Sequence, residues 1–112
     1  MGRIGTGVLK RLKGFGTKKI LVNDIETNRE LDSKYKLEWT SKEKIYKEAD
    51  IISLHTPLTQ LTKNMIRKQH LLTMKPDMII INTSRGGIIN EHDLYEVMLS
   101  GHLSGAAIDV FE

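Results

Sequence analysis

The run Asn-Thr-Ser-Arg-Gly-Gly, residues 82–87, contains the residue types in this sequence that are best suited to chemistry. Arg85 carries a guanidinium group, whose planar fork matches a carboxylate through two parallel hydrogen bonds. The same group can stabilise negative charge that develops on a carbonyl oxygen. The two glycines leave room for a ligand to approach closely. A ligand-binding arginine is therefore one interpretation, and a solvated arginine in a glycine-rich turn is the other.

A second candidate site lies at the start of the chain, where Gly2 and Gly5 lead directly into a helical pattern. The bare N–H groups at a helix N-terminus bind phosphate, and Arg3 could add a full positive charge there. Asp24 follows Gly2 by about 20 residues, the spacing at which a dinucleotide-binding fold places a carboxylate for the ribose hydroxyls. The pattern predicts a dinucleotide site, with a plain helix start and a turn aspartate as the alternative.

Two hydrophobic periods alternate along the chain and predict an α/β fold. Apolar residues recur at helical spacing over residues 4–15 and 94–99. Between the helical segments lie short runs, several of them continuously apolar, which predict strands buried on both faces. Such strands, separated by helices, form a doubly wound, Rossmann-like parallel sheet that is covered on both sides. The strands are expected at residues 18–24, 35–39, 51–54, 78–81 and 104–110.

Capping signals mark where the helices begin and end. Gly16 is placed to end the first helix in a left-handed conformation. Thr40 and Glu43 have the spacing of a capping box, which predicts a helix beginning at Thr40. Asn90 is expected to cap a later helix that ends at Gly101.

Because ligands of such folds bind at the carboxyl ends of the strands, the residues that follow the strands are the ones to consider. They are Asp24, residues 55–57, residues 83–87 and Asp109.

The composition narrows the remaining function classes. The 112 residues suit one domain, and the net charge of +3 comes from dispersed basic residues without interleaved aromatics, which argues against nucleic acid. Nothing in the sequence has the length of a membrane span or the form of a signal peptide. There is no cysteine, and the four histidines lack metal-ligand spacing, so we expect no metal site and a cytoplasmic setting. His70, His92 and His102 are expected at the surface.

In their order and spacing, the motifs resemble the NAD-binding domain of the D-isomer-specific 2-hydroxyacid dehydrogenases. The resemblance runs over essentially all 112 residues. It implies a hydride-transferring oxidoreductase that uses NAD with a D-2-hydroxy acid or 2-keto acid, and a homodimer formed through the cofactor domain. The motifs that carry it are Gly-Arg-Ile-Gly at 2–5, Asp24, His-Thr-Pro-Leu-Thr at 55–59, residues 82–87 and the closing run 104–112.

The resemblance implies a role for each matching residue. Arg85 is implied to be the catalytic arginine, and His55 to belong to the cofactor wall rather than to donate a proton. A carboxylate at Asp24 favours NAD over NADP because it repels a 2′-phosphate, although Arg29 lies close by in sequence. The implied cofactor-binding residues are Gly2, Arg3, Ile4, Gly5, Asp24, Thr56, Pro57, Thr62, Thr83, Ser84, Arg85 and Asp109.

The match also departs from the family pattern at both ends of the chain. The first glycine of the phosphate turn and its strand would precede Met1, and the glutamate that tunes the catalytic histidine would follow Glu112. We therefore expect residues 1–112 to be a partial NAD-binding domain, without the first strand and the substrate domain, and inactive in isolation. Two alternatives remain: a non-catalytic, NAD(H)-responsive interaction module of the corepressor type, or a decayed gene fragment.

Overall fold

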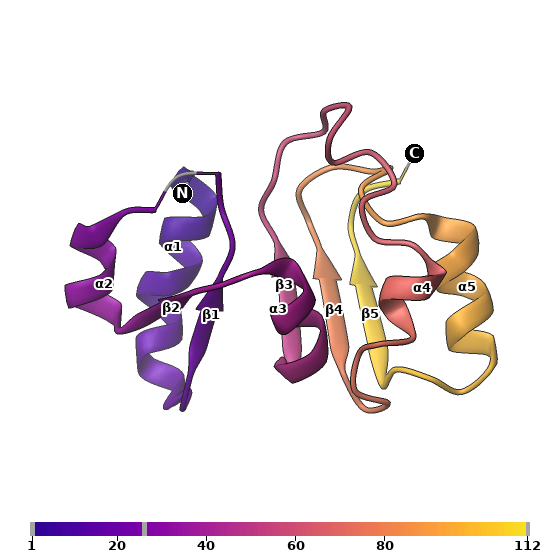
Figure 1. Ribbon diagram of the computed structural model, residues 1–112, viewed down its shortest axis with the longest axis horizontal. Helices are drawn as coiled ribbons and strands as arrows, with labels where there is room; N and C mark the ends of the chain where they lie inside the picture. The colour runs from indigo at the N-terminus through magenta and orange to yellow at the C-terminus, as the bar shows by residue number, and fades with distance from the viewer. Residues whose placement is uncertain (1, 26, 112) are drawn as a thin grey trace. The chain divides into compact units, whose positions relative to one another are not determined.

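The computed structural model describes residues 2–25 and 27–111, and the chain divides into two compact units, Met1–Ile45 and Tyr46–Glu112 (Figure 1). Parallel strands alternate with helices in both units, which confirms the predicted α/β class. The strands form two separate sheets, β1-β2 and β3-β4-β5. Among the described residues, β1 pairs only with β2 and β3 only with β4, so each has an unpaired edge.

The first unit is built around a helix and a small sheet. Helix α1 (Arg3–Leu12) continues into the short 3-10 turn η1 (Lys13–Phe15) and ends at Gly16. The φ angle of Gly16 is 67°, so the predicted left-handed helix end is confirmed. Strand β1 (Ile20–Val22) then pairs in parallel with β2 (Leu37–Trp39).

Polar side chains join the helices of this unit to its sheet. Helix α2 (Arg29–Tyr35) connects the two strands, and the Trp39 indole N–H donates to the carboxylate of Asp32 on this helix. On β2, the Glu38 carboxylate lies 2.7 Å from Lys44 Nζ and 3.3 Å from Lys19 Nζ. The hydrogen bond from Lys44 is the main cause that lowers the pKa of Glu38.

The cap of helix α3 (Lys42–Glu48) differs from the prediction. The Ser41 hydroxyl accepts a hydrogen bond of 3.2 Å from the Lys44 N–H, so Ser41 is the cap and the expected Thr40–Glu43 capping box is wrong. Thr40 instead continues the β2 segment, since its N–H donates to the carbonyl oxygen of Val22 at 2.9 Å. Serine and threonine can both cap a helix. The pairing of Thr40 with Val22 leaves Ser41 as the cap.

The second unit contains the larger sheet and most of the core. Its strands are β3 (Ile51–Leu54), β4 (Ile79–Asn82) and β5 (Gly105–Ile108), and its short helix is α4 (Lys68–Leu71). The longer helix α5 (Glu91–Leu99) is capped by Asn90, as predicted, through the N–H of Asp93 at 3.0 Å. The largest fully buried side chains of the described chain all lie here: Ile66, Leu71, Met78, Ile80, Ile88 and Val97.

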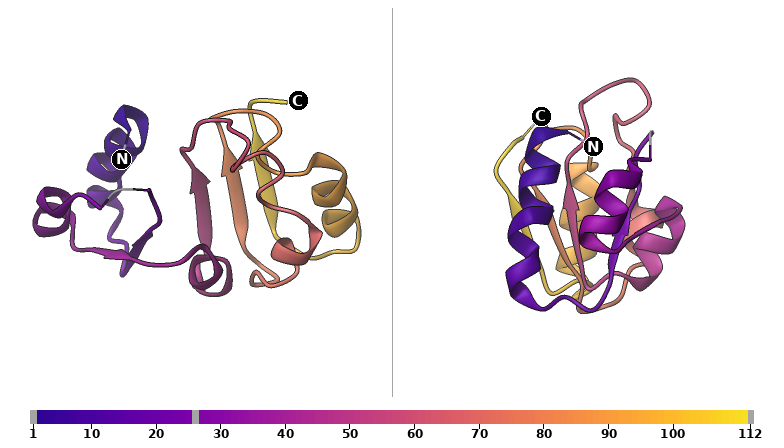
Figure 2. Two further views of the ribbon diagram at one scale, coloured as in Figure 1. Left: turned by 45° about the horizontal axis from the view of Figure 1, so that its top comes forward. Right: turned by 90° about the vertical axis from the view of Figure 1, so that its left-hand side faces the viewer.

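One face of this sheet is buried and the other is exposed. Ile52 and Ile80 are buried, whereas Ile51 and Ile79 of the same strands are 60% and 37% exposed. The expectation of strands covered on both faces therefore does not hold for this sheet. Figure 2 shows the helices of the second unit beside the sheet. Helix α5 lies over the buried face, since it shares an apolar groove with Ala106 and Ile108 of β5.

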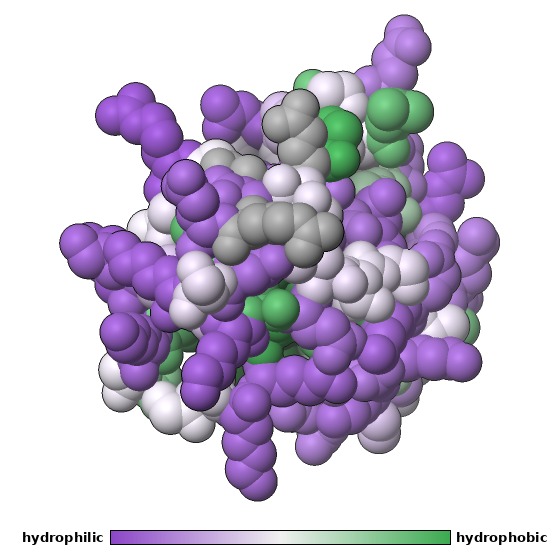
Figure 3. All heavy atoms as spheres, turned by 60° about the vertical axis from the view of Figure 1, so that its left-hand side comes forward, coloured by the Kyte–Doolittle hydropathy of each residue, from purple (hydrophilic) through white to green (hydrophobic). Residues whose placement is uncertain are grey.

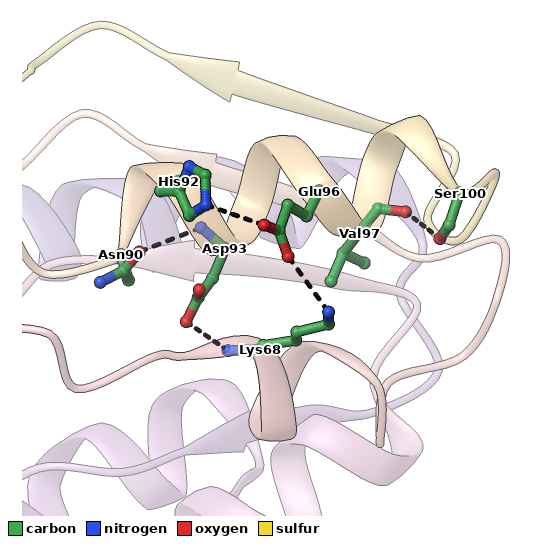
Figure 4. A network of polar contacts seen from close by, with 7 residues as sticks. All are labelled: Lys68, Asn90, His92, Asp93, Glu96, Val97 and Ser100. Atoms are coloured by element: carbon green, nitrogen blue, oxygen red, sulfur yellow. Dashed lines mark hydrogen bonds and ion pairs between the residues drawn. The ribbon is translucent and has the colours of Figure 1, made fainter.

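Ion pairs and hydrogen bonds fasten α4 to α5 (Figure 4). The Lys68 backbone N–H donates to Asp93 Oδ2 at 2.9 Å, and the Lys68 ammonium lies 3.1 Å from Glu96 Oε2. The other oxygen of Glu96 lies 2.8 Å from His92 Nε2. The hydrogen bond from Lys68 is the main cause that lowers the pKa of Glu96.

We expect Glu96→Gln to lower the melting temperature of the second unit by about 1–2 °C at pH 7, since exposed ion pairs contribute little. A carboxyl whose folded pKa is lowered contributes stability above its unfolded pKa, and this contribution is lost as the pH falls through the folded pKa. The difference between variant and wild type should therefore shrink as the pH falls below the unfolded pKa of the carboxyl. Thermal melts of Glu96→Gln, Lys68→Met and the double variant measure the coupling between Lys68 and Glu96. A difference in melting temperature that stays unchanged at low pH would contradict this prediction.

Hydrophilic side chains cover most of the face that Figure 3 presents. This agrees with a sequence of which 28% is charged. In residues 2–25 and 27–111, no helix has the length and apolar character needed to cross a membrane.

Candidate functional site

The pairing of the larger sheet aligns the candidate residues at its carboxyl edge. Leu54 pairs with Asn82, and Asn82 pairs with Ile108. The residues that come directly after these paired positions are His55, Thr83 and Asp109. Because the strand ends are paired, these three residues lie side by side along the carboxyl edge of the sheet. The N–H of Asp109 donates to the carbonyl oxygen of Asn82 at 3.1 Å and extends the pairing by one step.

The turn that carries Arg85 is organised by a buried amide. Asn82 is only 2% exposed, and its Nδ2 donates to the carbonyl oxygen of Arg85 at 2.9 Å. Its Oδ1 accepts from the N–H and the hydroxyl of Ser84, at 3.1 and 2.9 Å. The Arg85 side chain is exposed, and its Nη1 donates to the carbonyl oxygen of Ser84 at 2.6 Å. Asn82 was not among the predicted site residues, although asparagine commonly bonds to the backbone two residues on.

The loop after β3 carries Thr56, Pro57 and Thr62, and it is closed by its own threonines. The Thr62 hydroxyl donates to the carbonyl oxygen of Pro57 at 2.6 Å and accepts from the N–H of Thr59 at 2.8 Å. At the end of the loop, the N–H of Asn64 donates to the carbonyl oxygen of Gly87 at 2.7 Å. The structure therefore ties the threonine loop to the segment that carries Arg85.

Two side chains near the start of this loop have unusual surroundings. The Thr56 hydroxyl oxygen is buried and has no hydrogen-bond partner within the protein. His55 is half-buried, its Nε2 lies 2.8 Å from the Ser53 hydroxyl, and burial lowers the pKa of the ring. Burial therefore favours the neutral form of the His55 ring, which suits a wall residue better than a charged group.

In the first unit, the N-terminus of α1 is open to a ligand. Its N-cap is Gly2, which offers no side-chain cap, and the first turn contains no acidic residue. A Cβ built on Gly2 would meet nothing within 4 Å, so packing within the chain does not require a glycine there. Arg3 and Ile4 are exposed, and Gly5 is buried in the helix.

Asp24 follows β1 in the chain, and the carboxyl end of β1 lies at the end of the first unit where α1 begins (Figure 1). Its side chain is exposed, and one carboxylate oxygen accepts from the N–H of Ile25 at 2.6 Å. This hydrogen bond orients the carboxylate. The predicted residues thus form two groups, one in each unit: Gly2, Arg3, Ile4, Gly5 and Asp24 in the first, and Thr56, Pro57, Thr62, Thr83, Ser84, Arg85 and Asp109 in the second.

Two histidines outside the candidate site make contacts within the second unit. His70 and His102 are half-buried, contrary to the expectation of surface positions. His70 Nδ1 accepts from the N–H of Arg67 at 2.9 Å, and His102 Nε2 lies 3.0 Å from the Met74 carbonyl oxygen. Among the described residues, no three His, Cys, Asp or Glu side chains gather in a way that could hold a metal ion.

Parallel strands with polar turns at their carboxyl ends, and a helix N-terminus without a side-chain cap, are typical of α/β domains of the nucleotide-binding class. The full chain, residues 1–112, matches the family model described as "D-isomer specific 2-hydroxyacid dehydrogenase, NAD binding domain". The chain belongs to this family.

Individual relatives agree with the family match. The chain is 41% identical to a glyoxylate reductase of Korarchaeum cryptofilum over 112 residues, which cover 100% of this chain and 33% of that protein. It is 43% identical to an aromatic 2-oxoacid reductase of Clostridium sporogenes over 111 residues, which cover 99% and 33%. The crystal structure of Aquifex aeolicus D-lactate dehydrogenase complexed with NAD and lactic acid superposes with a TM-score of 0.93 at 38% identity, covering 99% and 33%. The chain thus spans about a third of the length of these relatives.

Proposed function

We propose that this chain binds NAD(H) and supplies the catalytic arginine for hydride transfer between NAD(H) and a D-2-hydroxy acid or its 2-oxo acid. The observation that carries the proposal is the exposed Arg85 on a turn that follows β4, braced by the buried amide of Asn82. Relatives named as glyoxylate and aromatic 2-oxoacid reductases support a 2-oxo acid as the substrate class.

The described residues fit a dinucleotide in two respects. The buried Thr56 hydroxyl lacks a hydrogen-bond partner, which a bound polar group would supply. The open α1 N-terminus, with Arg3 in its first turn, suits the charge of a pyrophosphate. We propose that these groups hold NAD together with Asp24 at the ribose and with Thr83, Ser84 and Asp109 near the nicotinamide. When bound, the reduced cofactor supplies a hydride.

Arg85 would perform two tasks toward the substrate. Its guanidinium fork binds the carboxylate that all 2-oxo acids share. It also stabilises the negative charge that develops on the keto oxygen during reduction. Both tasks require the side chain to reach the ligand from a defined turn.

We propose that turnover requires the remainder of a longer protein and that a homodimer forms through the cofactor domain. The relatives are about three times as long as this chain, because it covers 33% of them. The 112-residue chain alone should show no measurable NADH oxidation with glyoxylate, pyruvate or hydroxypyruvate. Steady oxidation by the pure chain would contradict this proposal.

Cofactor binding can be tested directly on the chain. Trp39 is its only tryptophan, so titration with NADH can be followed as energy transfer from tryptophan to the nicotinamide. A saturable transfer that excess NAD+ reverses supports the proposal. No transfer at millimolar NADH, together with no heat of binding by calorimetry, would remove its basis.

We expect Asp24→Ser to weaken NADH binding about 10-fold and to reduce the preference for NADH over NADPH. The carboxylate would accept charge-assisted hydrogen bonds from the ribose and repel a 2′-phosphate. Titrations with both cofactors measure the preference as a ratio of dissociation constants. Asp77→Ser is the matched control, because it makes the same charge change at an exposed residue before β4. Equal effects of the two substitutions would show that net charge alone is responsible.

A further inference from the structure

The Asn82 side chain connects the end of β4 to the turn that follows it. Asn82 is 2% exposed and is the one polar residue counted as buried in the described part of the chain. Its side chain forms hydrogen bonds with two residues of the following turn, Ser84 and Arg85. Its backbone carbonyl oxygen meanwhile accepts from the N–H of Asp109 at 3.1 Å. One residue therefore connects the Arg85 turn, Ser84 and the residue that follows β5.

These contacts require an amide. The Arg85 carbonyl oxygen needs a donor, which Nδ2 supplies, and the two Ser84 groups need an acceptor, which Oδ1 supplies. An aspartate of the same size offers acceptors only, unless it is protonated. A leucine would remove these partners of the Arg85 carbonyl oxygen and the Ser84 groups, whose hydrogen bonds are partly buried, at a cost in free energy.

We propose that Asn82 is a positioning residue for the site: its amide holds the Thr83–Arg85 turn in the geometry that receives the cofactor and the substrate carboxylate. The inference rests on the proposed function for the identity of the ligands. Asn82 does not itself touch the ligands and acts through Ser84 and Arg85. Without the amide, the guanidinium would be carried by a turn with several conformations, and binding would have to select one of them.

The Asn82→Asp variant provides a pH-dependent test. At pH 7.5 its carboxylate places an oxygen against the Arg85 carbonyl oxygen, where Nδ2 now donates, and we expect NAD+ to bind about 10-fold more weakly than to wild type. Burial disfavours the charged form, so protonation should restore a donor as the pH falls toward 5. The affinity ratio to wild type should then return toward one. Calorimetry at several pH values on the 112-residue chain measures this ratio.

Two further variants separate positioning from general stability. Asn90→Ala removes a cap of α5 and should lower the melting temperature without changing NAD+ affinity below that temperature. Asn82→Ala should increase hydrogen exchange of the Ser84 amide about 10-fold without ligand, whereas Asn82→Asp keeps that acceptor and should not. NAD+ binding to Asn82→Ala and Asn82→Asp equal to wild type at every pH would overturn the inference.

The proposed function fails separately, if wild type binds no NAD+ at all. In that event, hydrogen exchange of the Ser84 amide still tests whether the Asn82 amide holds the turn. Unchanged Ser84 exchange in Asn82→Ala would then show that the amide does not hold the turn.

Discussion

Replacing Arg85 by glutamine should lower kcat/KM for 2-oxo acid reduction by about 10²- to 10³-fold, the usual effect of removing one group that stabilises a developing oxyanion. The measurement needs a protein of full length. A chimera provides it, in which this chain replaces the matching segment of the Korarchaeum cryptofilum glyoxylate reductase, of which it covers 33% at 41% identity. NADH oxidation with glyoxylate gives kcat and KM.

The controls follow from the structure. Arg85→Lys keeps the charge but loses the planar fork, so it should retain only part of the activity. Arg67→Gln removes an exposed arginine whose Nε donates to the carbonyl oxygen of Asn64, and it should leave kcat/KM nearly unchanged. If the unmodified chimera turns over and Arg85→Gln does so equally well, Arg85 is not the catalytic arginine. That result would favour a non-catalytic, cofactor-responsive module.

The isolated chain should unfold in two stages, with the first unit losing its structure at a urea concentration lower by about 1 M. Of the buried hydrophobic side chains in the described chain, only Leu9 and Val22 belong to the first unit. Its sheet has two strands, and sheets of this size are marginal without further packing. Within residues 2–25 and 27–111, β1 and β2 form one sheet and the strands of the second unit form another.

Trp39 makes this prediction measurable, because the only tryptophan lies in the first unit. Its fluorescence should change before the main loss of far-ultraviolet circular dichroism. A Trp39→Phe/Tyr95→Trp variant moves the reporter to α5 of the second unit, where Tyr95 is 64% exposed, and its signal should follow the main transition. Coincident transitions for both reporters and circular dichroism would refute independent unfolding.

The unpaired edges of β1 and β3 also predict association. Exposed strand edges pair with other chains, and the exposed Ile51 and Ile79 add apolar surface on one face of the larger sheet. The first transition should therefore depend on protein concentration.

The sequence by itself determined the α/β class, the order of the elements and the residues at the strand ends. These follow from local information: the hydrophobic period separates helices from strands, and a glycine at the end of a helical pattern, such as Gly16, favours a left-handed helix end. The family was also readable from the sequence, because its motifs are short and contiguous. The catalytic role of Arg85 is a prediction from the same motifs.

Only the tertiary structure decided which polar atoms are satisfied and which faces are covered. Ser41 rather than Thr40 caps α3, because Thr40 is held by pairing with Val22 across the sheet. Asn82 acquires its importance from burial beneath a turn, and Thr56 from a hydroxyl without a partner. The division into two sheets likewise depends on which strands meet. These properties arise from contacts between residues distant in sequence, and hydrophobic patterns carry no record of such contacts.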